Sequence, residues 1–238
     1  MQDADATAVA PRWGLVDWFI AWVGAYIAVI VCQPLVVAIT GQGGVDDSDK
    51  WPLSTVALLQ VPLYGVMLGA ALIITKRKGN GPIADLRLGI TWRDIPLGLA
   101  VGAALQAVGN LLYVPLYWLS DYSSSDIDEA ARKLTDRAHG TGSVLLLLVV
   151  LVVAAPIVEE IFFRGFLLRA LERRIGTNWA IVASSLLFAI SHFELLQLPA
   201  LFLFGVGAAV LAVRSGRLGP GMVAHFAFNG VAAYFLLR

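Results

Sequence analysis

The sequence predicts an all-α protein, a polytopic transmembrane helical bundle of about seven spans, and two observations carry this prediction. Of its 238 residues, 58% are hydrophobic and only 14% are charged, and the mean hydropathy is +0.77. Such a composition lies well outside that of ordinary soluble domains. The apolar residues also gather in runs of roughly 20, which is the length that crosses a hydrocarbon core of about 30 Å. We therefore expect a multi-pass protein of the cell membrane, surrounded by the lipid bilayer.

Seven apolar runs are the candidate spans. They cover residues 15–39, 53–75, 95–119, 143–168, 178–192, 198–213 and 219–237. The fifth and sixth are short, because at about 1.5 Å per residue they reach only some 22 to 24 Å, so a thin hairpin is an alternative. The first run, of about 25 residues, is longer than a signal-peptide core, and we expect it to be retained. Without internal repeats or linkers, residues 1–238 are expected to form one membrane domain, with a motif-bearing core at about 143–238.

Lysine and arginine in short loops predict the orientation, because they collect on the cytoplasmic side. With the N-terminus inside, 12 of the 17 basic residues fall on the inner side: Arg12, Lys76, Arg77, Lys78, Arg87, Arg93, Arg164, Arg169, Arg173, Arg174, Arg214 and Arg217. The outer side holds Lys50, Arg132, Lys133, Arg137 and Arg238. We therefore expect a cytoplasmic N-terminus, a cytoplasmic loop at 76–93 and an external loop at 120–142.

The external loop is polar, and we expect a short helix over Ile127–His139, started by Ser125 or Asp126. This segment is either a cap over the outer mouth of the bundle or a solvated connector. The formal net charge of the chain is zero, so nucleic acid is not an expected partner. The single cysteine, Cys32, excludes an intramolecular disulfide and a cysteine-based metal site.

The fourth apolar run contains two adjacent carboxylates. A charged side chain in a membrane helix costs about 2.5 to 3.5 kcal/mol and normally faces the bundle interior or a cavity. Glu160 and Arg164 are four residues apart, in the favourable order for a helix ion pair, whereas Glu159 is turned about 100° away and is free to face another helix. Pro156 lacks a backbone N–H and is expected to bend the helix just before this point. The alternative is that both carboxylates reach back to the inner interface.

Two later runs contain histidine. His192 ends the segment "FAISH", and His225 and Asn229 lie on one face of the last predicted helix in "HFAFN". Taken separately, His192 can be a packing residue, and the last pair can be a hydrogen-bonded contact between helices. Taken together, a carboxylate, two imidazoles and an amide on three helices can activate a water and stabilise an oxyanion.

The three motifs EExxxR, FxxxH and HxxxN occur in this order, at Glu159, Glu160, Arg164, Phe188, His192, His225 and Asn229. The set resembles the motifs of the CPBP family, the CAAX proteases and bacteriocin-processing enzymes, also called the Abi or type II CAAX prenyl endopeptidase family. The resemblance covers about residues 155 to 230. It implies a CAAX-type intramembrane (metallo)endopeptidase, and a membrane-associated or prenylated CaaX-like peptide or protein as its substrate.

The expected chemistry is peptide-bond hydrolysis in a water-filled cavity that opens toward the inner side. Glu159, with His192, holds and deprotonates the attacking water, and the carboxylate returns the proton to the leaving amine. His225 and Asn229 donate hydrogen bonds to the oxyanion. Two alternatives use the same residues differently: a proton-coupled transporter with a Glu/His relay, and a non-catalytic immunity protein.

The remaining expectations concern the residues that position Glu159 and the question of a bound metal ion. Glu160 and Arg164 are expected to hold Glu159 in place. A catalytic Zn²⁺ takes three protein ligands plus water, and Glu159, His192 and His225 are the candidate ligands. Each comes from a different helix, without paired spacing, and the amide of the third motif suits an oxyanion hole better than a zinc site. Between no cofactor and zinc, we expect metal-free activation of water.

Overall fold

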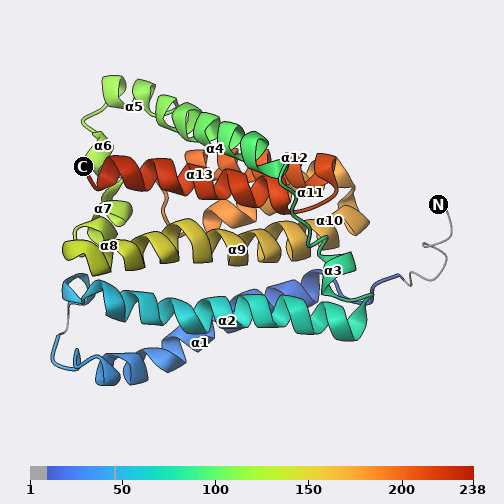
Figure 1. The fold of residues 1–238 in the computed structure, drawn as a ribbon, viewed down its shortest axis with the longest axis horizontal. Coiled ribbons are helices and arrows are strands. Elements are labelled where there is room, and N and C mark those ends of the chain that lie inside the picture. Colours follow the sequence, from blue (N-terminus) through green and yellow to red (C-terminus); the bar gives the residue numbers. More distant parts are fainter. Residues whose placement is uncertain (1–9, 46) are drawn as a thin grey trace.

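The computed structural model describes residues 10–45 and 47–238, and every regular element within them is a helix. The long helices run side by side along the long axis of the molecule (Figure 1). The all-α, polytopic helical bundle predicted from the sequence is therefore confirmed.

The helices are, in chain order, α1 Leu15–Ile39, a 3₁₀ turn Ser48–Lys50, α2 Leu53–Lys78, α3 Pro82–Asp85, α4 Asp94–Leu111, α5 Val114–Leu119, α6 Ser124–Ile127, α7 Glu129–Thr135, α8 Gly140–Leu148, α9 Ala155–Glu159, α10 Leu168–Ile175, α11 Thr177–Ile190, α12 Leu198–Ser215 and α13 Gly219–Leu236. Two π-helical stretches, Val149–Ala154 and Glu160–Leu167, join α8, α9 and α10. The result is one helical segment over Gly140–Ile175.

Five of the seven predicted runs are helices long and apolar enough to cross a membrane: Leu15–Ile39, Leu53–Lys78, Asp94–Leu119, Gly140–Ile175 and Leu198–Ser215. The other two are helical as well. However, α11 has only 14 residues, and α13 carries His225 and Asn229, whose polar side chains lower its hydropathy. The multi-pass character is shown, while the number seven stays approximate.

The third predicted span differs from the expectation, because its helix is interrupted. α4 ends at Leu111 and the chain resumes as α5 at Val114, with Pro115 in the first turn. A proline has no N–H to donate to the preceding turn, so the helical hydrogen bonds are broken at this point.

Small residues let the C-terminal helices approach closely, as is common in membrane bundles. A Cβ added to Gly102 of α4 would lie 2.1 Å from the carbonyl oxygen of Ala224 on α13. A Cβ on Gly205 of α12 would lie 2.9 Å from the Cβ of Ser185 on α11. These contacts position α12 and α13 around the motif-bearing segment.

The buried core is centred on the second π stretch. All eight residues of Glu160–Leu167 are buried, and three of them are phenylalanines that pack edge-on against one another. Trp13 and Trp18, from the start of the chain, pack against these rings. α1 is therefore part of the wall around the motif residues.

The prediction for the loop at 120–142 was wrong in its helix boundaries. Instead of one helix over Ile127–His139, the structure has α6 and α7 separated by Asp128. α6 starts earlier because Ser123 is its N-cap and Asp126 reaches back to the Ser123 N–H at 2.7 Å, which completes a capping box. Gln197 donates to the carbonyl of Ile127 at 3.0 Å, so the segment is tied to the turn between α11 and α12. That contact favours the cap over the solvated connector.

Candidate active site

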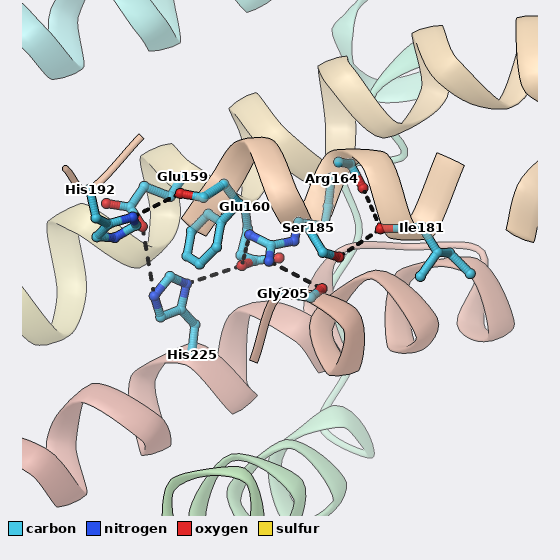
Figure 2. Close-up of polar contacts among 10 residues, drawn as sticks. Glu159, Glu160, Arg164, Ile181, Ser185, His192, Gly205 and His225 are labelled. Carbon is cyan, nitrogen blue, oxygen red and sulfur yellow. Dashed lines mark hydrogen bonds and ion pairs between the residues drawn. The ribbon is translucent and has the colours of Figure 1, made fainter. Parts of the chain in front are cut away.

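Glu159, Glu160, Arg164 and His225 come together in the structure (Figure 2). Arg164 pairs with Glu160, and His225 lies within ion-pair distance of both carboxylates. Glu159 is the last residue of α9, and Glu160 and Arg164 belong to the π stretch that follows. His225 projects from α13. Two segments far apart in the sequence thus supply one charged cluster inside the bundle.

Glu160 is the central member of this cluster, and its side chain is fully buried. Its Oε1 lies 3.0 Å from Arg164 Nη1 and also 3.0 Å from His225 Nδ1. The ion pair expected from the four-residue spacing is present, but the contact with His225 was not expected. α13 comes close here because residue 221 is a glycine, whose added Cβ would lie 3.2 Å from Glu160 Oε2.

The Arg164 guanidinium is enclosed by aromatic rings and a backbone carbonyl. The side chain is 1% exposed, and its Cζ lies 4.2 Å from the centroid of the Phe188 ring. Its Nη2 donates to the carbonyl of Gly205 at 3.3 Å. A cation held over a ring face and against a carbonyl keeps favourable electrostatic contacts without water. Arg164 is therefore built into the core.

The hydrogen bond that His225 donates to Glu160 fixes the tautomer of His225. An ionised carboxylate only accepts hydrogen bonds, so Nδ1 of His225 carries the proton and donates to Glu160 Oε1. Nε2, on the other side of the ring, lies 3.7 Å from Glu159 Oε2. In a neutral imidazole this nitrogen has a free lone pair, and a second proton there would face Glu159.

His192 lies two residues beyond the end of α11, where its Nδ1 is 2.8 Å from the carbonyl oxygen of Phe188. Because a carbonyl only accepts, Nδ1 carries the proton and Nε2 has the free lone pair. The His192 and His225 ring centroids are 4.8 and 5.9 Å from that of Phe188, so both imidazoles pack against one phenyl ring. The ring hydrogen bond of His192 goes to this carbonyl rather than to Glu159.

Asn229 has a partner that the sequence analysis missed. Its Nδ2 donates to the carbonyl of Leu151 at 2.8 Å. In the first π stretch the Ala155 N–H donates to Val150 O, and the next possible donor to Leu151 is Pro156, which has no N–H. Asn229 therefore donates to the Leu151 carbonyl the hydrogen bond that Pro156 cannot donate.

The two π stretches are the second feature that the sequence analysis missed. They flank the short helix that carries Pro156 and Glu159, where only a bend was predicted. π-helical turns occur frequently at functional sites. Pro156 inside a long apolar run was the sequence signal for a backbone irregularity.

Residues 141–231 match the family model of the type II CAAX prenyl endopeptidase Rce1-like proteins. This part of the chain is similar to the Rce1-like proteins, and we refer to it as the Rce1-like domain. A protein of Escherichia coli described as "Uncharacterized 24.3 kDa protein" is 39% identical over 87 residues, or 34% of this chain and 40% of that protein. The chain thus aligns with about two fifths of the length of this curated relative. No solved structure matches.

The Rce1-like domain contains all six of the predicted site residues, but α1, from outside it, supports them. Trp22 donates through its indole N–H to Ser191 Oγ at 3.1 Å, and the Tyr26 hydroxyl donates to the Ser191 carbonyl at 2.7 Å. Ser191 immediately precedes His192, and Phe193 after it adopts a left-handed φ of 57°. α1 therefore helps to hold the irregular turn that presents His192.

The histidine and carboxylate side chains of the Rce1-like domain are the possible ligands of a metal ion. Within residues 10–45 and 47–238, no group of three or more His, Cys, Asp or Glu side chains is arranged to hold one. Glu160 is engaged by Arg164, whereas both imidazoles donate from Nδ1 and keep Nε2 free. In the described part of the chain, these side chains are not arranged as a zinc ligand set.

Proposed function

We propose that this chain is an intramembrane endopeptidase that hydrolyses a peptide bond of a membrane-associated or prenylated CaaX-like peptide, with a water activated by Glu159 and His192. The Rce1-like domain supports CAAX-type intramembrane proteolysis at the level of the family. The observation that carries the proposal is the pair of oriented imidazoles beside a carboxylate that is not fixed by the Arg164 ion pair.

In the proposed first step, a water is held between the Glu159 carboxylate and Nε2 of His192. Nε2 of His192 has a free lone pair because Nδ1 donates to Phe188, and the Glu159 carboxylate has no hydrogen bond to Arg164. As the water oxygen attacks the scissile carbonyl carbon, its proton passes to Glu159, the general base. When the C–N bond breaks, Glu159 returns this proton to the leaving amine, so the site is regenerated.

In the same proposal, His225 and Asn229 stabilise the tetrahedral oxyanion. The Asn229 amide has two N–H groups, and one remains after the bond to Leu151. His225 can donate from Nε2 only as an imidazolium. A second proton on His225 would make the cluster electrically neutral, with two cations (Arg164 and His225) facing two carboxylates (Glu159 and Glu160). Removal of one such donor typically costs about 3 to 4 kcal/mol in other enzymes.

The test is cleavage by the purified full-length chain in proteoliposomes, with a prenylated CaaX peptide and a panel of membrane peptides as substrates. We expect Glu159→Gln and His192→Ala to lower turnover by at least about 100-fold while the unfolding midpoint stays near that of the wild type. Glu194→Gln is the matched control, because Glu194 is a carboxylate two residues from His192 that makes none of the cluster contacts.

Cleavage by Glu159→Gln at the wild-type rate would overturn the proposed base. Proton uptake into the liposomes without any cleavage would favour the transporter alternative instead.

A further inference from the structure

A cavity of about 400 Å³ lies where the start of α1 meets the end of α10, and a second cavity of about 420 Å³ is also lined by Trp13. Three arginines, Arg12, Arg173 and Arg174, line the first cavity, together with one carboxylate, Asp17. Its charge is therefore mainly positive. The proposed catalytic residues do not line either cavity.

The carboxylate of this cavity is already engaged. Asp17 forms an ion pair with Lys78 and accepts a hydrogen bond from the Gly14 N–H at 2.9 Å. Of the ion pairs in the described part of the chain, none includes Arg12, Arg173 or Arg174. None of the three guanidinium groups around this cavity therefore forms a close ion pair among the described residues, although Asp85 and Glu172 act on Arg173 at longer range.

One of these arginines is held rigidly. The Cζ of Arg173 lies 3.9 Å from the centroid of the Trp13 ring, and its Nη2 donates to the Trp13 carbonyl at 2.7 Å. Trp13 is itself only 2% exposed and donates its indole N–H to Asp85 at 2.8 Å. The second cavity also contains Arg173 and adds Arg169, which is 4% exposed and whose Nε is buried without a hydrogen-bond partner among the described residues.

Exposed apolar side chains lie along α1 next to the basic cavity. Val16 lines the cavity and is 65% exposed. Ile20, one turn further along α1, is also 65% exposed. Trp179, on the first turn of α11, which packs against α10, is 69% exposed. Tryptophan is enriched where a membrane protein meets the headgroup layer. The positive cavity therefore lies at the edge of a lipid-facing surface.

We propose that this cavity binds the headgroup phosphate of an anionic phospholipid, whose acyl chains lie along Val16 and Ile20. Arginine forks suit the oxygens of a phosphate, and basic pockets at the ends of membrane helices bind anionic headgroups. A free phosphate ion would use the same guanidinium groups but would gain nothing from the apolar flank. The site is independent of the proposed peptidase activity.

The experiment uses the full-length chain, purified in a neutral detergent and titrated with phosphatidylglycerol, phosphatidylcholine or inorganic phosphate. Native mass spectrometry counts the bound lipids and gives the dissociation constant, and the unfolding midpoint reports stabilisation. We expect phosphatidylglycerol to bind and to raise the midpoint. The double variant Arg12→Gln/Arg174→Gln should weaken it roughly 30-fold, from about fivefold for each basic residue.

The matched control is Lys76→Gln/Arg77→Gln, which removes the same charge at the same end of the bundle but outside the cavity. We expect this variant to bind phosphatidylglycerol like the wild type. An equal loss of affinity in the control variant would mean that the overall positive charge of this end attracts the lipid, and it would overturn the proposed site. Binding of phosphatidylcholine with equal strength, or displacement of the lipid by equimolar inorganic phosphate, would overturn the assignment to an anionic lipid. Equal midpoints of all variants without lipid would establish that they fold.

Discussion

Glu160 shares one buried oxygen between Arg164 and His225, and this changes the role that the sequence analysis gave it. Adjacent carboxylates were expected to act as one reactive group and one support for it. In the structure Glu160 orients the imidazole on α13, with His225 Nδ1 at 3.0 Å, while Arg164 compensates its charge from the next turn. The role of Glu160 is therefore to connect helices as well as to balance charge.

Arg164→Ala tests this at the level of one side chain. The substitution leaves Glu160 buried without its cation, and breaking a buried pair in this way typically costs about 3 to 5 kcal/mol. We expect a clear drop in the free energy of unfolding in detergent, followed by tryptophan fluorescence. The double variant Glu160→Gln/Arg164→Met should recover much of the loss, because it removes both charges and keeps the volume. Wild-type stability of Arg164→Ala would show that the pair does not stabilise the bundle.

The helical segment over Gly140–Ile175 is the element on which the site depends. Its two π stretches and Pro156 leave the carbonyl of Leu151 without a donor from its own helix, and α13 supplies one through Asn229. Inside a bilayer no water is present to satisfy such a group. This hydrogen bond therefore also fixes the position of α13 relative to the carboxylates.

A double-mutant cycle between Asn229 and Pro156 measures this contact. Asn229→Leu alone should destabilise the protein by about 1 to 3 kcal/mol, because Leu151 O loses its partner. In a Pro156→Ala background a backbone N–H is available again, so the same substitution should cost clearly less. The measurement is the free energy of unfolding of the four variants. Strictly additive effects would mean that Asn229 does not compensate for the proline.

Across the whole molecule, the two ends of the bundle differ in charge and in what they carry. Figure 1 shows the end of α2 and α3 at one end, and α6 and α7 at the other. The arginines around Trp13 lie at the first end, and the polar segment after α5 at the second. A membrane perpendicular to the long axis of the molecule would place these two ends on opposite sides.

Reporter fusions at Lys78 and Ser124 test this arrangement. The bias of lysine and arginine toward the cytoplasmic side predicts that a fusion at Lys78 reports from the cytoplasm and one at Ser124 from the outside. Alkaline phosphatase, active outside, and green fluorescent protein, fluorescent inside, should give opposite patterns at the two positions. The same location for both would contradict a bundle that spans the membrane in this register.

The sequence predicted those features that depend on neighbouring residues in one helix. The first apolar run, 15–39, has the limits of α1, and the Glu160–Arg164 pair follows from its spacing. The contact between Glu160 and His225 could not be predicted, because it depends on how far α13 approaches at Gly221. The first π stretch also depends on the tertiary fold, since Asn229, which donates to Leu151 within it, comes from a distant helix.

The chain is synthesised from its N-terminus, and this order has a consequence for the buried Arg164. When the segment over Gly140–Ile175 first leaves the ribosome, its charged side chains can pair only with one another. The Gly205 carbonyl, which accepts a hydrogen bond from Arg164, lies 41 residues after it in the sequence. His225 lies 65 residues after Glu160. A lone helix with these charges enters lipid at a cost of about 2.5 to 3.5 kcal/mol for each unpaired group. We therefore expect the nascent segment to stay beside the insertion machinery, or near the membrane surface, until α12 and α13 have been made.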